Sequence, residues 1–171
     1  MKPLQDLSII ANIAVSKEQE NAAFENFLQQ QNSDAVDDLV HKLNNEIEPQ
    51  IDCTQCGNCC RTLMINVEKP DAARLSAHLE LSEEDFYNTY VETSSTGVVS
   101  VMSKIPCHFL YENKCAVYEA RPTECREFPG LHHPHFTQRL FATFMHYARC
   151  PIVFNVIEAL KEKMVFASNS V

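Results

Sequence analysis

Four cysteines within eight residues constrain this chain more than any other feature of its sequence. They form the run C-x2-C-x2-C-C, which comprises Cys53, Cys56, Cys59 and Cys60. Two cysteines with two residues between them can wrap a turn so that both sulfurs face one cation, and Gly57 permits the positive φ that such a turn often needs. Zinc takes four sulfurs at about 2.3 Å, and an iron–sulfur cube also takes four thiolates. The run therefore predicts a zinc or iron–sulfur centre.

Cys59 and Cys60 are adjacent in the chain. Because consecutive side chains diverge in most backbone conformations, we expect the two sulfurs to be poorly placed for one shared ion. One would bind the first centre, while the other would reach a second centre or pack inside the protein.

The other four cysteines are scattered, and only the fold can bring them together. They are Cys107, Cys115, Cys125 and Cys150. All eight are candidate ligands, enough for two four-thiolate sites or for one cluster with spare cysteines, and the spacing leaves both arrangements open. Cys150, directly before Pro151, also fits the alternative of a small buried apolar residue.

Disulfides or thiol redox chemistry would also account for so many cysteines. Disulfides would require export, but the apolar segment Leu7 to Val15 is short, is interrupted by Asn12 and lacks a basic flank beyond Lys2. A redox C-x-x-C normally opens a helix after a strand, and that context is not evident around Cys53. We therefore expect a cytoplasmic protein with reduced thiols.

Three arginines close to cysteines are candidates for supporting the bound group. Arg61 follows Cys60, and Arg121 and Arg126 flank Cys125. Four thiolates on Zn²⁺ leave a net charge of about −2, which is costly to bury without donors around it. Ion pairs with neighbouring glutamates would account for these arginines equally well. His108, after Cys107, is the histidine best placed to replace a cysteine as ligand.

The charge of the chain argues against a nucleic-acid partner. Net charge is −9, and the first fifty residues hold nine acidic groups against three lysines. Phosphate binding needs a basic face, which such a chain does not offer. No apolar run approaches the length of a membrane span. A protein partner stays open, with the amphipathic segment 17–48 as the candidate surface, and the sequence names no small-molecule substrate.

The predicted fold is a compact α+β domain, mainly helical, with a small sheet or hairpin and cysteine-rich metal loops. Residues 1–50 should form an N-terminal helical hairpin, with helices at 17–31 and from Ser33 or Asp34 to Pro49, packed on a cysteine-cluster domain at 51–171. The elements expected in that domain are short strands at 63–67 and 98–101, a hairpin at 109–117, a helical turn at 118–125, and helices at 70–79, 82–91, 140–147 and from 151 onward.

Several further residues surround the cysteines in a recognisable pattern. They are Pro106-Cys107, Cys115, Tyr118-Glu119-Ala120-Arg121-Pro122, Cys125-Arg126 and Phe128-Pro129. Together with Cys53 to Cys60, they make residues 51–151 resemble the C-x2-C-x2-C-C cysteine-cluster family, whose bacterial members are called YkgJ-like. The resemblance implies a bacterial, cytoplasmic domain that chelates zinc or iron. A related domain occurs in flagellin lysine methylases, but this chain is too short for that whole enzyme.

Two functional hypotheses follow. In the first, the thiolates hold zinc or an iron–sulfur centre that fixes the loops around it. In the alternative, an iron–sulfur cluster, of the 4Fe-4S type for example, performs redox chemistry or assists the modification of a partner protein. No Gly-rich phosphate loop, G-x-S-x-G elbow or H-E-x-x-H motif is present, so the sequence names no catalytic residue and leaves open whether the protein is an enzyme.

Overall fold

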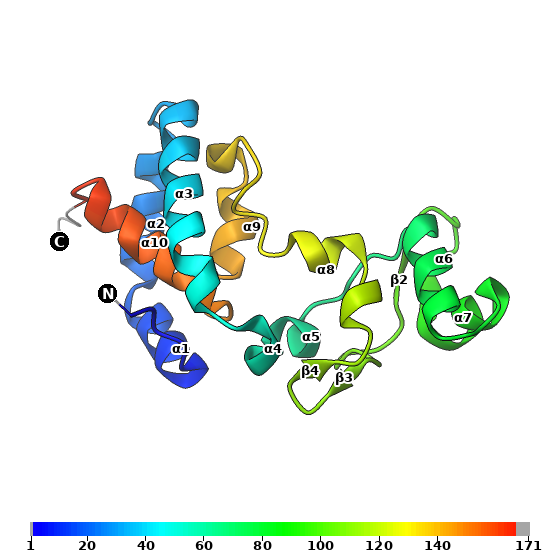
Figure 1. Ribbon diagram of the computed structural model, residues 1–171. Coiled ribbons are helices and arrows are strands. Elements are labelled where there is room, and N and C mark those ends of the chain that lie inside the picture. Colours follow the sequence, from blue (N-terminus) through cyan, green and yellow to red (C-terminus); the bar gives the residue numbers. More distant parts are fainter. Residues whose placement is uncertain (1, 167–171) are drawn as a thin grey trace. The chain divides into compact units, whose positions relative to one another are not determined.

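The computed structural model describes residues 2–166 and divides the chain into two compact units (Figure 1). Unit 1 combines the chain up to Asp52 with the chain from Pro129 onward, and unit 2 runs from Cys53 to Phe128. Helices dominate the described residues, and the strands form two small antiparallel pairs. The predicted mainly helical α+β class is confirmed.

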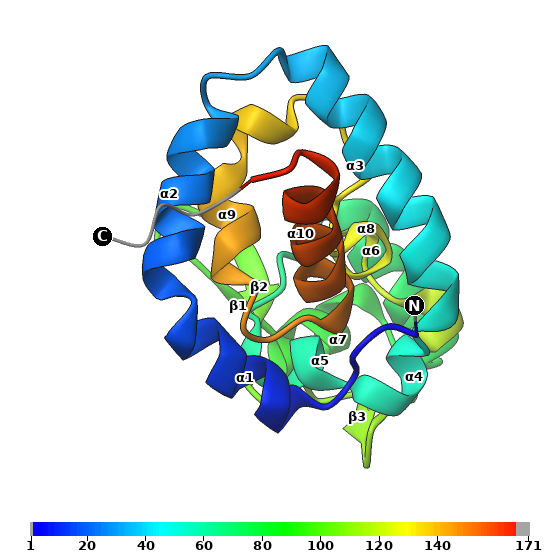
Figure 2. The ribbon, with the colours of Figure 1, turned by 90° about the vertical axis from the view of Figure 1, so that its left-hand side faces the viewer.

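The units begin and end at other points than the sequence predicted. Residues from 129 onward belong with the N-terminal helices and not with the cysteine run, because α10 (Pro151–Lys163) packs against α3 (Ser33–Ile47). In Figure 2, α10 lies within a ring formed by the other long helices of unit 1. Val153, Val156 and Leu160 of α10 are fully buried. The apolar faces of the N-terminal helices therefore cover this last helix.

Unit 1 is helical throughout its described secondary structure. Its elements are α1 (Leu7–Ser16), α2 (Glu18–Leu28), α3, η1 (Glu48–Gln50), η3 (Phe136–Gln138), α9 (Leu140–Met145) and α10. The apolar segment from Leu7 forms α1, whose first turn is capped by Asp6: its Oδ1 accepts from the amides of Ser8 and Ile9 at 2.9 and 3.0 Å. The cap of α3 is Asn32 and not Ser33 or Asp34, since its side chain accepts from the Ala35 amide.

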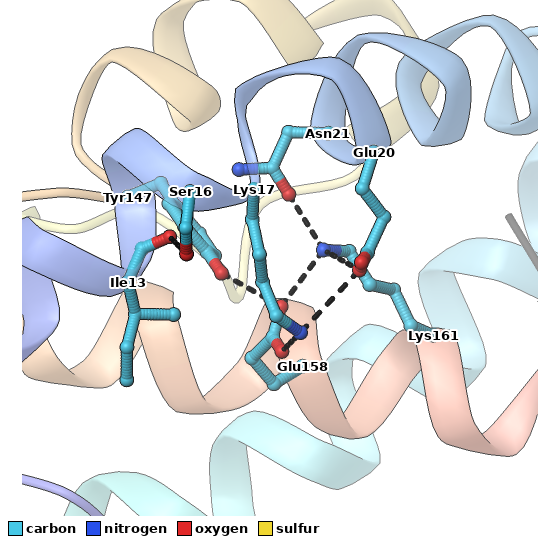
Figure 3. A network of polar contacts seen from close by, with 8 residues as sticks. All are labelled: Ile13, Ser16, Lys17, Glu20, Asn21, Tyr147, Glu158 and Lys161. Carbon is cyan, nitrogen blue, oxygen red and sulfur yellow. Dashed lines mark hydrogen bonds and ion pairs between the residues drawn. The ribbon is translucent and has the colours of Figure 1, made fainter. Parts of the chain in front are cut away.

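A buried network of polar side chains joins α10 to α2 and to the chain after α9 (Figure 3). Lys161, 5% exposed, donates from Nζ to Glu20 Oε1, Asn21 Oδ1 and Glu158 Oε1 at 2.7, 2.6 and 2.8 Å. Lys17 pairs with both carboxylates, and the Tyr147 hydroxyl donates to Glu158 Oε1 at 2.7 Å. Three acceptors satisfy the three donors of the buried ammonium, as a charge in a helical core requires.

Unit 2 consists of short elements around its own apolar core. They are α4 (Cys53–Cys56), α5 (Asn58–Thr62), α6 (Lys69–His78), α7 (Glu83–Tyr90), β1 (Val91–Thr93), β2 (Ser100–Met102), β3 (Leu110–Tyr111), β4 (Lys114–Cys115), η2 (Tyr118–Ala120) and α8 (Thr123–Glu127). Leu75, Phe86, Met102 and Phe109 are among the buried residues of this core. Ser82 caps α7 with Asp85, as its sequence predicts.

The strand predictions hold in part. The hairpin expected at 109–117 is present, with Leu110 opposite Cys115 and Tyr111 opposite Lys114. The strand expected at 63–67 appears only as a single bridge between Asn66 and Val101, although this segment still exchanges backbone hydrogen bonds with β2. β2 itself pairs with β1, a strand that no alternation of apolar and polar residues in the sequence predicts.

Candidate metal centre

The cysteine run forms two short helices that turn sharply at one glycine. α4 and α5 are joined by Gly57, which has φ +61°. A Cβ at this position would lie 2.8 Å from the carbonyl oxygen of Asn113 in the β3–β4 turn. Only glycine meets both requirements, the positive φ and the close approach. The turn at Gly57 therefore does two things. It reverses the direction of the cysteine run, and it brings the run into contact with the β3–β4 hairpin.

Backbone contacts bring later cysteines to the run. The amide of Cys107 donates to the carbonyl oxygen of Cys60 at 2.8 Å. Cys115 lies in β4, against which α4 packs, and Cys125 lies in α8. All eight cysteines lie within the described residues, and none of them forms a disulfide there. Segments about fifty residues apart along the chain therefore meet in one place.

The sulfurs of Cys59 and Cys60 do not diverge, so our expectation for this pair was wrong. The two Sγ atoms are 3.9 Å apart. Consecutive residues of a helix project about 100° apart. Two side chains at that angle can still turn their ends toward each other when their rotamers rotate toward the same side.

The thiols of this cluster oppose one another's ionisation. A hydrogen bond from Cys60 lowers the pKa of Cys59 to about 7, whereas the same hydrogen bond and burial raise the pKa of Cys60. Burial, together with the charges of Cys59 and neighbouring thiolates, raises the pKa of Cys107 and Cys115 and brings that of Cys125 to about 12. The five sulfurs of Cys59, Cys60, Cys107, Cys115 and Cys125 are therefore close enough for the charge on one thiolate to change the pKa of another.

The chemistry of these donors suits a thiophilic metal, although among the described residues no three cysteine sulfurs lie within 4.8 Å of one another. Without a cation, the cluster ionises one thiol readily and the others only at high pH. A bound Zn²⁺ or iron ion would reverse that preference, because its charge deprotonates a coordinating thiol outright. Half-buried, reduced sulfurs from several segments are the ligands that zinc and iron–sulfur centres take.

The three predicted arginines lie near the cluster, but they contact mainly backbone. Arg61 donates to the carbonyl oxygens of Cys56 and Glu112 at 3.1 and 2.6 Å, and to Oδ1 of Asn113. It thereby joins α4 and α5 to the hairpin turn. The Arg126 guanidinium donates to the carbonyl oxygens of Arg121 and Glu119.

Arg121 acts through charge. Its guanidinium stacks 3.7 Å from the centre of the Tyr118 ring and donates to the Tyr118 carbonyl oxygen. Burial is the main cause of the raised pKa of Cys115, and the positive charge of Arg121 opposes that rise. The charge of Arg121 thus favours the thiolate form of Cys115.

A second arginine-centred contact was missed at the sequence level. Arg74 of α6 donates to the carbonyl oxygens of Ala120 and Arg121 at 3.2 and 2.9 Å, and to Asp71 Oδ1 at 2.6 Å. These contacts attach the segment between Cys115 and Cys125 to α6. Asp71 lies only three residues before Arg74, but no local pattern marks the contact with residues 120 and 121, because they lie nearly fifty residues away along the chain.

Other predicted site residues lie in different surroundings. Cys150 belongs to unit 1, where it is 6% exposed at the start of α10. Cys53 and Cys56, at the two ends of α4, are more exposed than Cys150. His108 Nε2 lies 3.0 Å from the Ser103 hydroxyl, and its ring packs edge-on against Tyr90. That hydrogen bond already engages one of the two histidine ring nitrogens.

The fold and the site together define a small cysteine-cluster protein of the metal-binding class. A family model described as "CxxCxxCC: Putative zinc- or iron-chelating domain" matches residues 52–146, more than half of the chain, and the protein belongs to this family. The resemblance seen in the sequence is thereby confirmed. No curated protein and no solved structure matches the chain. In the described part of the chain, no helix combines the length and hydropathy needed to cross a membrane.

Proposed function

We propose that unit 2 is a metal–thiolate domain that holds zinc or an iron–sulfur centre between α4–α5 and the segment 107–125. The observation that carries the proposal is the convergence of partly buried cysteines from separate segments: the Sγ atoms of Cys59 and Cys60 lie 3.9 Å apart, and the Cys107 amide donates to the Cys60 carbonyl oxygen at 2.8 Å. Ionising such a group together needs a cation among the sulfurs. Cys53 and Cys56 are further candidates on α4, and Cys150 is assigned to the core of unit 1.

The role that this geometry supports best is structural. The elements carrying the cysteines are very short: α4 spans Cys53–Cys56, β4 spans Lys114–Cys115, and α8 spans Thr123–Glu127. Helices and strands of this length are not stable by themselves. A metal bound between them would fix their relative positions, so its binding free energy becomes folding free energy of unit 2.

The cysteines, which form no disulfide among the described residues, and the acidic chain suggest a cellular setting. Reduced cysteines persist in a reducing compartment, which supports the cytoplasm as the location. The net charge of −9 supports partners other than nucleic acid.

Elemental analysis of the full chain, purified without oxygen and without added metal, tests the proposal. We expect stoichiometric zinc in colourless protein, or iron with acid-labile sulfide in brown protein. The brown form would favour the alternative of an iron–sulfur component of an enzyme. Protein that retains neither metal and binds neither during reconstitution would overturn the proposal.

Paired variants test which sulfurs are involved. Cys107→Ser should lower metal content, whereas Cys150→Ser, at a buried thiol of unit 1, should leave it unchanged. Hydrogen exchange then tests the structural role: chelation should expose amides of residues 53–62 and 107–125 and leave those of α3 and α10 protected. Loss of metal from Cys150→Ser would overturn the assignment of Cys150 to the core.

A further inference from the structure

Three exposed side chains outside the cysteine run lie together just after α8. Glu127 is the last residue of that helix, and His132 and His133 follow in the next loop, within seven consecutive residues. Each of the three offers one potential ligand atom, and these atoms all lie within 4.8 Å of one another. The rings of His132 and His133 are 4.2 Å apart between their centroids. Two imidazoles beside a carboxylate are a ligand set that divalent transition metals take.

The loop that carries the two histidines is fixed by an arginine. The Arg139 guanidinium donates to three carbonyl oxygens of this loop, those of Gly130, His133 and Pro134, at 2.9, 2.6 and 3.2 Å. His41 Nε2 of α3 lies 3.3 Å from the same His133 carbonyl oxygen. These contacts engage the backbone of the loop and not the imidazole of His133.

A buried carboxylate fixes the end of the same loop. Asp37 of α3, 7% exposed, accepts from the amides of His135 and Phe136 at 2.6 and 2.8 Å. His135 itself has φ +60°, so the chain turns sharply there. Because the backbone on both sides of His133 is already held, binding an ion would require little further ordering of the chain.

The spacing of the three donors suits a small metal ion. Zinc binds imidazole nitrogen and carboxylate oxygen at about 2.0–2.2 Å, so its tetrahedral ligands lie about 3.4 Å from each other. Exposed side chains can reach that spacing by rotation about their χ angles, since all three end groups already lie within 4.8 Å. These nitrogen and oxygen donors are harder than thiolates, which makes the group chemically distinct from the cysteine cluster.

We propose that Glu127, His132 and His133 bind one divalent transition-metal ion of the zinc, cobalt and nickel class. The two imidazoles supply neutral nitrogens, and the carboxylate supplies one negative charge. Three protein ligands leave the remaining coordination position to water or to an external ligand. The inference does not depend on the proposed function, because no cysteine takes part in this site.

Titration of the full chain with Co²⁺ gives a direct test. Cobalt bound by thiolates shows strong sulfur-to-metal charge-transfer absorption, whereas cobalt bound by nitrogen and oxygen shows only the weaker d–d bands. We expect one equivalent of cobalt that adds d–d absorption without charge transfer. In ¹H–¹⁵N spectra of the imidazoles, the ring signals of His132 and His133 should be broadened by the paramagnetic ion. Unchanged ring signals, or charge transfer from every bound cobalt, would overturn the inference.

Variants identify the ligands. His132→Gln, His133→Gln and Glu127→Gln should each weaken this cobalt equivalent at least about tenfold, since even changes outside a ligand shell cost about 10–100-fold. All three side chains are exposed, so the substitutions leave the buried cores intact. His78→Gln, at the exposed last residue of α6, is the matched control and should bind cobalt as the wild type does. Equal weakening by His78→Gln, or wild-type affinity in Glu127→Gln, would overturn the site.

The outcomes separate this inference from the proposed function. Protein that binds cobalt through sulfur alone would overturn the histidine–carboxylate site and support the metal–thiolate domain. Protein that binds cobalt through nitrogen and oxygen alone would support this site and count against the metal–thiolate domain. Protein that binds no cobalt at either place would overturn the inference.

Discussion

Asp71 and Thr123 are joined by two hydrogen bonds across unit 2. The amide and the hydroxyl of Thr123 both donate to Oδ1 of Asp71, at 3.0 and 2.9 Å. The same oxygen accepts from Arg74, and the Asp71 side chain is 2% exposed. This contact attaches the start of α8, and with it the helix of Cys125, to α6.

Removing the Asp71 carboxylate should destabilise unit 2. Burial opposes ionisation of Asp71, but the hydrogen bonds from Thr123 and Arg74 outweigh it and lower the pKa of the carboxyl. Asp71→Ala leaves Arg74 and the Thr123 amide without this acceptor, and we expect the free energy of unfolding to fall by about 2–4 kcal/mol. Urea unfolding followed by circular dichroism measures it. Glu83→Gln, in the exposed first turn of α7, should change it by less than about 0.5 kcal/mol. Equal effects would contradict this role for Asp71.

Two glycines with similar backbone angles should respond differently to alanine. Gly57 and Gly97 have φ of +61° and +72°, so both substitutions introduce backbone strain of about 1 kcal/mol. Only at Gly57 does the new methyl group meet the Asn113 carbonyl, at 2.8 Å, because nothing lies within 4 Å at Gly97. We expect Gly57→Ala to weaken zinc binding at least tenfold and Gly97→Ala to leave it unchanged. Competition with a chromophoric chelator measures both, and a strong loss of affinity in Gly97→Ala would count against a steric cause.

Arg61 should contribute to metal affinity without binding metal. Its guanidinium donates to the Cys56 and Glu112 carbonyls and to Asn113, which a lysine cannot do simultaneously in the same geometry. Arg61→Lys keeps the charge and should still weaken zinc binding about 10–100-fold, as expected for residues that position ligands. Lys69→Gln removes an exposed charge from α6 as the control. Wild-type affinity in Arg61→Lys would mean that charge alone accounts for the residue.

The polar network of unit 1 should make its stability depend on acid pH. Burial opposes ionisation of Glu158, but hydrogen bonds from Lys161, Lys17 and Tyr147 outweigh it and lower the pKa of Glu158 below its ordinary value. Because the folded pKa lies below the unfolded value of about 4.3, the unfolded chain binds the proton more readily. The stabilisation is complete above that pH and is lost as the pH falls through the folded pKa.

Glu158→Gln tests this linkage. The variant should be less stable at pH 7 by about 1–3 kcal/mol, and its stability should vary less below pH 4.5 than that of the wild type. NMR resonances of Val156, in the buried part of α10, report the unfolding of unit 1 during a pH titration. Asp38→Asn, at an exposed position of α3, is the control. An unchanged acid dependence in Glu158→Gln would show that other carboxylates carry it.

Local patterns predicted many of the elements. Ser82 with Asp85, Pro151 at the start of α10 and the hairpin around Asn113 act through neighbouring residues, so their signals lie in short stretches of sequence. The same approach missed the pairing of β1 with β2, and it placed the end of one domain at residue 171. The missed β1–β2 pair is local, with Thr93 opposite Ser100, but its short strands carry no clear apolar alternation. The extent of unit 1 depends on contacts between residues far apart along the chain, which periodicity does not encode.

The sequence by itself determined that this is a reduced-cysteine, metal-binding protein, because the C-x2-C-x2-C-C run and the later cysteines specify thiolate chemistry through residue type and spacing. The tertiary structure decided which sulfurs meet. The Sγ atoms of Cys59 and Cys60 converge although the residues are adjacent, and a backbone hydrogen bond brings Cys107 to them. Rotamers and long-range backbone contacts set these distances, and both depend on how the whole unit packs.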